Sequence, residues 1–74
     1  MIHELDTCGL SCPLPVLKAR KRLMQLSSRD VLRVLADDPA AWVDLPLFCK
    51  ENGHILKEVQ ELENDCVAYV IEKA

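Results

Sequence analysis

The chain has 74 residues, half of them hydrophobic, a formal net charge of −3 at neutral pH, and only three aromatic side chains of Phe, Tyr and Trp. These values indicate one small globular domain over residues 1–74 and argue against a disordered chain and against direct binding of nucleic acid. No apolar run is long enough to span a membrane, and the first residues lack the segments of a signal peptide, so a cytoplasmic protein without membrane attachment is expected.

The first third of the chain predicts a strand, a loop and a helix. Residues 2–6 have the mixed character of a short strand, and Gly9 lets the following loop turn. A helix is predicted from residue 13 to about residue 26, with Pro15 tolerated in its first turn. Its apolar residues recur at roughly helical spacing and are expected to face the core: Leu14, Leu17, Leu23, Met24 and Leu26.

The middle of the chain predicts a second strand and a second helix. Residues 31–35 are rich in strand formers and read as a largely buried strand. Asp38 is expected to cap a helix that begins with Pro39 and ends at Asn52-Gly53. Because Pro46 falls inside this segment, the helix is expected either to kink there or to split into two pieces, the second capped by Asp44.

The last third predicts two more strands. Residues 55–62 and 66–71 are strand-like, and Glu63-Asn64-Asp65 between them suits a hairpin turn, so the two strands should be antiparallel. The predicted order is therefore β-α-β-α-β-β. It indicates an α+β fold, a two-layer sandwich in which both helices cover one face of a four-stranded mixed sheet.

Cys12 is the strongest candidate for a reactive residue. It directly precedes Pro13 at the expected start of the first helix, which places its thiol at the N-cap and Pro13 at the first helical position. The free N–H groups of the first turn and the positive end of the helix dipole stabilise negative charge at that position. We therefore expect a lowered pKa for the Cys12 thiol and a nucleophilic thiolate.

Three blocks of the sequence follow a known pattern. The first, residues 5–16, reads LDTCGLSCPLPV and contains Cys-Pro-x-Pro; the second joins Asp38-Pro39 to residues 44–49, and the third is residues 52–54. In order and spacing these blocks resemble the TusA-type (SirA-like) sulfur-carrier family over nearly the full chain. The resemblance implies the same β-α-β-α-β-β sandwich. One departure is the turn after the first helix, where family members often carry glycine and this chain has Ser27-Ser28-Arg29.

The resemblance also implies a function. Cys12 would be the catalytic residue, accepting sulfane sulfur as a persulfide from a cysteine desulfurase or a rhodanese-like donor and passing it to a cysteine of an acceptor protein. Pro13, Pro15 and Gly9 belong to the same motif as supporting residues. The family serves tRNA thiolation, molybdenum-cofactor enzymes and sulfur metabolism, with some members linked to selenium. The sulfurtransferase chemistry needs no cofactor and suits a monomer, and whether such a carrier counts as an enzyme stays open.

Lys18 and Cys8 are accessory candidates. Lys18 lies one to two turns beyond Cys12 and would stabilise a thiolate or guide an acidic partner, although a solvated helix face is the simpler interpretation. Cys8 would resolve a Cys12 persulfide, or it is only a small loop residue. An alternative function is therefore a thiol redox or regulatory module that uses Cys12 with Cys8. A third alternative is an adaptor that recruits a partner through the basic first helix.

The two remaining cysteines and the distribution of charge say less about the function than Cys12 does. Cys49 and Cys66 fall in apolar patterns and are expected in the core, and all four thiols are expected to be free. No metal site is expected, because the cysteine spacing lacks the close pairs of zinc sites.

Basic residues gather in the first half of the chain and acidic residues dominate from Asp37 onward. One positive and one negative surface are expected, which favours steered encounters with a charged partner.

Overall fold

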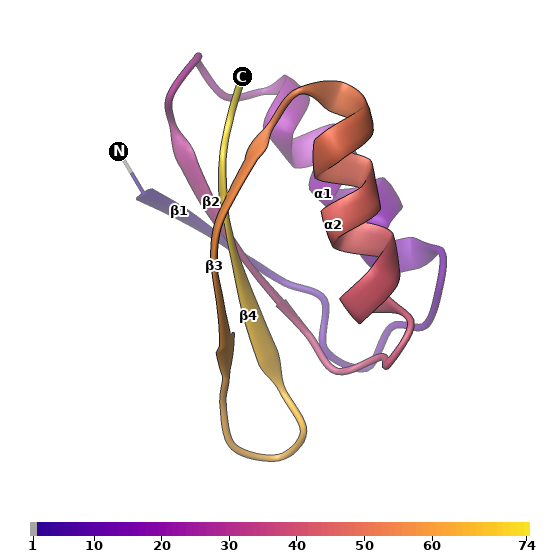
Figure 1. The fold of residues 1–74 in the computed structure, drawn as a ribbon. Helices are drawn as coiled ribbons and strands as arrows, with labels where there is room; N and C mark the ends of the chain where they lie inside the picture. Colours follow the sequence, from indigo (N-terminus) through magenta and orange to yellow (C-terminus); the bar gives the residue numbers. More distant parts are fainter. Residues whose placement is uncertain (1) are drawn as a thin grey trace.

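The computed structural model describes residues 2–74 and has the predicted element order. The strands are β1 (Ile2–Asp6), β2 (Val31–Ala36), β3 (Ile55–Glu61) and β4 (Val67–Glu72), and the helices are α1 (Leu14–Met24) and α2 (Ala41–Asn52). The sheet order is β1-β2-β4-β3, with β1 parallel to β2 and the other two pairs antiparallel. Both helices lie on the same side of the sheet (Figure 1). The predicted two-layer sandwich is confirmed.

The core lies between the helices and the two central strands. Leu45 of α2 and Leu23 of α1 pack with side chains of β2 and β4, of which Tyr69 is the largest and is fully buried. Burying a large apolar side chain stabilises the fold by about 1.5–3 kcal/mol, so this cluster is the main source of stability.

Among residues 2–74, no helix has the length and apolar character needed to cross a membrane.

The apolar face predicted for α1 is largely wrong. Leu14, Leu17 and Met24 are exposed to 42%, 50% and 74%, whereas Ala19 and Leu23 are buried. At 100° per residue, the three exposed side chains lie on the opposite side of the helix from the buried pair. The sheet-facing side uses a small alanine, which lets α1 approach the strands closely and which a search for large apolar residues passes over.

Helix α2 is a single uninterrupted helix that contains Pro46, so the prediction of a second piece capped by Asp44 is wrong. The helix begins at Ala41, two residues later than predicted. Asp38 caps the turn before it, because its Oδ1 accepts a hydrogen bond from the Ala40 N–H at 3.1 Å. Gly53 ends the helix as predicted, with a left-handed φ of 75° and its N–H on the Cys49 carbonyl.

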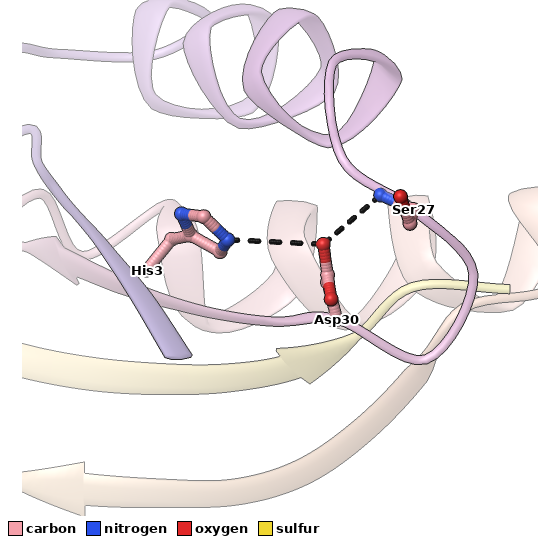
Figure 2. A network of polar contacts seen from close by, with 3 residues as sticks. All are labelled: His3, Ser27 and Asp30. Carbon is pink, nitrogen blue, oxygen red and sulfur yellow. Dashed lines mark hydrogen bonds and ion pairs between the residues drawn. The ribbon is translucent and has the colours of Figure 1, made fainter. Parts of the chain in front are cut away.

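The turn between α1 and β2 closes without glycine. The Asp30 N–H donates to the Ser27 carbonyl at 3.0 Å, and Arg29 takes a positive φ of 73°, in the region that glycine prefers. The Asp30 carboxylate accepts the Ser27 N–H at 3.0 Å and lies 3.7 Å from Nε2 of His3 on β1 (Figure 2). These contacts tie the start of β1 to the turn and hold Arg29 in its unusual conformation.

The predicted hairpin between β3 and β4 is confirmed. The Cys66 N–H donates to the Glu63 carbonyl at 3.2 Å, and the two residues between them, Asn64 and Asp65, have positive φ values of 59° and 60°. Two successive left-handed residues characterise the type I′ turn, whose twist matches that of paired strands. Asn and Asp tolerate this conformation better than most residues, which explains their presence here.

Candidate functional site

The loop that carries Cys12 is pinned to the chain around the end of β2. The Thr7 N–H and hydroxyl both donate to the Leu35 carbonyl, at 2.8 and 2.6 Å. The Gly9 N–H donates to both carboxylate oxygens of Asp37 at 3.0 Å. The Cys12 N–H donates to Oδ2 of Asp38. The carboxylates of Asp37 and Asp38, which directly follow β2, therefore fix the backbone of this loop beside the C-terminal ends of β1 and β2.

The Cys12 thiol is exposed and has a carboxylate partner on α2. Its Sγ donates a hydrogen bond to Oδ2 of Asp44 at 2.9 Å. This hydrogen bond is the main reason that the pKa of the Cys12 thiol is raised; partial desolvation and the negative charges of Asp44 and Asp38 act in the same direction. In this conformation the thiol is held in its protonated form.

The predicted N-cap position and lowered pKa of Cys12 are therefore wrong. Helix α1 starts at Leu14, with Pro13 as its N-cap residue, so Cys12 stands one residue outside the cap. The Leu14 N–H already donates to the Ser11 carbonyl at 2.9 Å, within a turn that precedes the helix. The favourable helix dipole acts only near the first turn, whereas the carboxylate of Asp44 touches the thiol directly and its effect prevails.

The predicted supporting residues have different environments. Pro13 is joined to Cys12 by a cis peptide bond and is the N-cap residue of α1, and Pro15 is buried in the first turn of the helix. Gly9 has a φ of 87°, which explains why the loop needs glycine there. Lys18 is exposed and lines a hollow of about 150 Å³ together with Leu5, Lys21, Arg22 and Gln25. Lys18 thus belongs to a basic cluster on α1.

The other three cysteines are dissimilar. Cys49 is 2% exposed in the core, as predicted, and burial raises its pKa to about 11. Cys66 precedes β4, is partly exposed and lines an open cavity of about 460 Å³, so its predicted place in the core is wrong. The side chain of Cys66, then burial and the Asp6 carboxyl raise the pKa of Cys8 to about 12.

The thiols of Cys8 and Cys12 have different neighbours. The Cys12 thiol donates a hydrogen bond to Asp44, whereas Cys66 is the chief cause of the raised pKa of Cys8. All four thiols are free, as predicted. Among residues 2–74, no group of three His, Cys, Asp or Glu side chains is gathered as a metal site would require.

Sequence reasoning missed the role of Asp44. This residue lies 32 positions from Cys12, and it was noted only as a possible helix cap and as part of the second sequence block. Asp38 was expected to cap the second helix, but its Oδ1 accepts the Ala40 N–H in the turn before α2 and its Oδ2 accepts the Cys12 N–H. The Asp6 carboxylate, at the end of β1, accepts the Cys8 N–H at 2.9 Å. Contacts of this kind depend on tertiary structure, so spacing alone does not reveal them.

Three comparisons with known proteins all lead to the same family of proteins. The family model described as "Sulfurtransferase TusA" matches residues 3–73. The sulfur carrier protein TusA of Allochromatium vinosum is 48% identical over 59 residues, which cover 80% of this chain and 78% of that protein. The crystal structure of a SirA-like protein from Desulfitobacterium hafniense superimposes with a TM-score of 0.85 at 30% identity, covering 97% of this chain and 96% of the other.

Proposed function

Because this chain belongs to the TusA family of sulfur carriers, we propose that Cys12 accepts sulfane sulfur as a persulfide and transfers it to a cysteine of an acceptor protein. The donor is a cysteine desulfurase or a rhodanese-like protein. The observation that carries this proposal is the setting of Cys12, an exposed thiol on a loop whose backbone is fixed by Asp37 and Asp38. A fixed loop presents the sulfur to successive partners in the same position.

Both transfers are thiol displacements at sulfur. In loading, the Cys12 thiolate attacks the terminal sulfur of the donor's persulfide, the donor's S–S bond breaks, and the donor cysteine leaves as a thiolate. In unloading, the acceptor thiolate attacks the terminal sulfur of the Cys12 persulfide, and the Cys12 thiolate leaves. No electron is gained or lost overall, because the sulfane sulfur moves from one thiol to the next. The reaction therefore requires no cofactor.

Asp44 controls when Cys12 becomes a nucleophile. Its Oδ2 accepts the thiol proton in a hydrogen bond of 2.9 Å, which raises the pKa of Cys12. Before a donor docks, the thiol is protonated and protected from unwanted oxidation, since the thiolate is the reactive form. A docked partner that draws the Asp44 carboxylate away, for example with a basic side chain, removes this effect and frees the thiolate.

The carrier fits any of three sulfur-relay uses: tRNA thiolation, supply to molybdenum-cofactor enzymes, or sulfur metabolism. Each use presents the same chemistry to Cys12 and differs in the docking partners. The four free thiols suit a reducing compartment, which supports a cytoplasmic location.

A sulfur-release assay tests the proposal. The protein is loaded with cysteine and an affinity-tagged, pyridoxal-phosphate-containing cysteine desulfurase; after removal of the desulfurase, cyanide is added to strip sulfane sulfur as thiocyanate. About one equivalent of thiocyanate per chain is expected, and the Cys12→Ser variant should release only the background amount. Cys49→Ser is the matched control, because this buried thiol should not be loaded. Equal release from wild type and Cys12→Ser would refute the proposal.

A further inference from the structure

Strand β1 forms one edge of the sheet. The sheet order is β1-β2-β4-β3, and within residues 2–74 β1 pairs with β2 alone. The Thr7 N–H, just after β1, donates to the Leu35 carbonyl of β2 at 2.8 Å. Because the backbone groups of successive strand residues point to alternate sides, those of Leu5 also face β2, whereas those of Glu4 and Asp6 face outward. The outer edge of β1 therefore presents backbone donors and acceptors to a further strand.

The edge at β1 is regular and held in place. Its pairing with β2 runs without a register shift over the whole strand. His3, near its start, lies 3.7 Å from the Asp30 carboxylate in the turn after α1 (Figure 2). The other edge strand, β3, has an irregular register between Leu56 and Glu58. Such irregularities protect an edge against pairing with another strand, and β1 lacks this protection.

A row of basic side chains lies beside this edge. Lys18, Lys21 and Arg22 of α1, which we call the basic row, line the hollow of about 150 Å³ together with Leu5 of β1 and Gln25. Lys21 and Arg22 follow Lys18 by three and four positions, so the three lie on one flank of the helix. Leu5 packs against the core and thus faces the helices. The hollow therefore lies between α1 and β1, with cations along its helix side.

The charge of the basic row is not balanced within the part of the chain that the structure describes, where no carboxylate forms an ion pair with its members. The opposite face of β1 differs. There Glu4 is paired with Arg33 at 2.7 Å, and the Asp6 carboxylate accepts the Cys8 N–H. A strand added to this edge would thus meet positive charge with those of its side chains that face α1.

We propose that the outer edge of β1 binds an extended acidic segment of a partner protein, which adds a strand to the sheet and sets alternate carboxylates against the basic row. Main-chain hydrogen bonds to Glu4 and Asp6 hold the segment, and the basic row selects its charge. A second copy of this chain does not suit the edge, because antiparallel pairing of two β1 strands brings two basic rows to the same face of the joined sheet. This surface is separate from the function proposed for Cys12.

The test uses the full chain and a short fluorescein-labelled peptide of alternating Glu and Val, with fluorescence anisotropy measured at low ionic strength. This peptide should bind saturably, and a peptide of alternating Lys and Val should not bind. Lys21→Gln should weaken binding about two- to fivefold, because it removes one charge pair. Arg20→Gln is the matched control and should leave binding almost unchanged, since Arg20 is exposed on α1 but does not line the hollow.

Strand pairing has a readout of its own. In the wild-type complex, hydrogen exchange measured by NMR should slow at the amides of Glu4 and Asp6, because these N–H groups then donate to the peptide. Glu4→Pro removes one outward donor and leaves the hydrogen bonds to β2 in place, so it should abolish binding. Glu4→Gln keeps the donor and should bind at least as well as wild type. Far-UV circular dichroism verifies that each variant is folded.

Three results would overturn the proposal. The first is no saturable binding of the Glu–Val peptide, and the second is binding that leaves exchange at Glu4 and Asp6 unchanged. The third is displacement of the peptide by oligothymidylate as readily as by unlabelled peptide, because the basic row would then be a general surface for anions and not a site for an acidic strand.

Discussion

At the scale of single residues, the chemistry of Cys12 depends on one carboxylate. A thiol beside a helix N-terminus is normally a better acid than free cysteine. In this protein the thiol is a weaker acid, because Asp44 accepts its proton in a hydrogen bond and adds a negative charge nearby. The Cys12 thiol is consequently less reactive at rest than its sequence motif suggests, which is the reason for proposing that a docked partner activates it.

Replacing Asp44 with Asn should make Cys12 more acidic. The pKa of Cys12 is raised by the hydrogen bond to Asp44 and by its charge, so Asp44→Asn should lower that pKa. Because the thiolate is the form that reacts, alkylation of Cys12 by iodoacetamide should speed up at neutral pH, and its pH–rate curve should move to lower pH. Peptide mass spectrometry of protein alkylated at a series of pH values measures this curve.

Glu51→Gln is the matched control for Asp44→Asn. Glu51 lies on the same helix, also carries a negative charge and is exposed. Its neutralisation should leave the pH–rate curve of Cys12 almost unchanged. If Asp44→Asn left the curve in place, or moved it to higher pH, the assignment of Asp44 as the controlling group would be incorrect.

The sequence identified Cys12 itself, because a Cys-Pro-x-Pro motif is local. It did not reveal the hydrogen bond with Asp44, which lies 32 positions from Cys12 along the chain. The error in the pKa of Cys12 has a simple origin. A shift of one residue in the start of α1 removes the thiol from the cap, and helix ends are the least certain part of any sequence-based assignment.

At the scale of secondary-structure elements, the connections show how local sequence determines the fold. The hairpin turn uses Asn64 and Asp65, which accept positive φ, and Gly53 ends α2 in the same conformation. These three positions were predictable, since their residue types are the ones that the conformation favours. The turn after α1 is the exception, because Arg29 occupies a left-handed conformation with a side chain that disfavours it.

Replacing Arg29 with glycine should therefore stabilise the protein. The substitution relieves the conformational cost of a left-handed residue, partly offset by the greater freedom of glycine in the unfolded chain, for a net gain of about 0.5–1 kcal/mol. Urea denaturation followed by circular dichroism measures the free energy of unfolding. The neighbouring change Ser28→Gly is the control and should reduce stability, because Ser28 has no positive φ to relieve. A loss of stability in Arg29→Gly would show that the Arg29 side chain contributes more than its backbone costs.

Element order and sheet pairing could be predicted because alternating strand and helix patterns leave few topologies for so short a chain. The orientation of α1 on the sheet could not be predicted in this way. Its large apolar residues, such as Leu17 and Met24, suggest one face, but the sheet selects the face with Ala19. Close approach of a helix to a sheet favours a small side chain, and hydrophobicity alone does not register this preference.

At the scale of the whole molecule, stability resides in the layer between helices and sheet. Leu45 is fully buried there, while Leu47, two residues along the same helix, is half exposed. Leu45→Ala should lower the free energy of unfolding by about 2–5 kcal/mol. Leu47→Ala should lower it by about 0.5 kcal/mol or less. Comparable losses in the two variants, measured by urea denaturation, would contradict the assignment of the core.

The charge asymmetry of the sequence also appears in the whole molecule. Acidic residues line the larger cavity, including Asp37, Asp38 and Asp65, and basic residues line the hollow on α1. Asp38 also holds the backbone of Cys12, so the negative surface adjoins the reactive loop. A donor or acceptor protein that docks beside these carboxylates meets a negative electrostatic potential, which favours the binding of a partner with a basic docking surface.

The most direct test of the central claim is to locate the transferred sulfur by mass spectrometry. The protein is loaded by a cysteine desulfurase, alkylated and digested, in a Cys8→Ser background, so that Cys12 is the only cysteine in the peptide of residues 1–18. A sulfur carrier predicts an additional mass of about 32 Da on Cys12 in this peptide, lost on treatment with a reductant. An unmodified Cys12, with the added sulfur found on Cys49 or Cys66 instead, would contradict it.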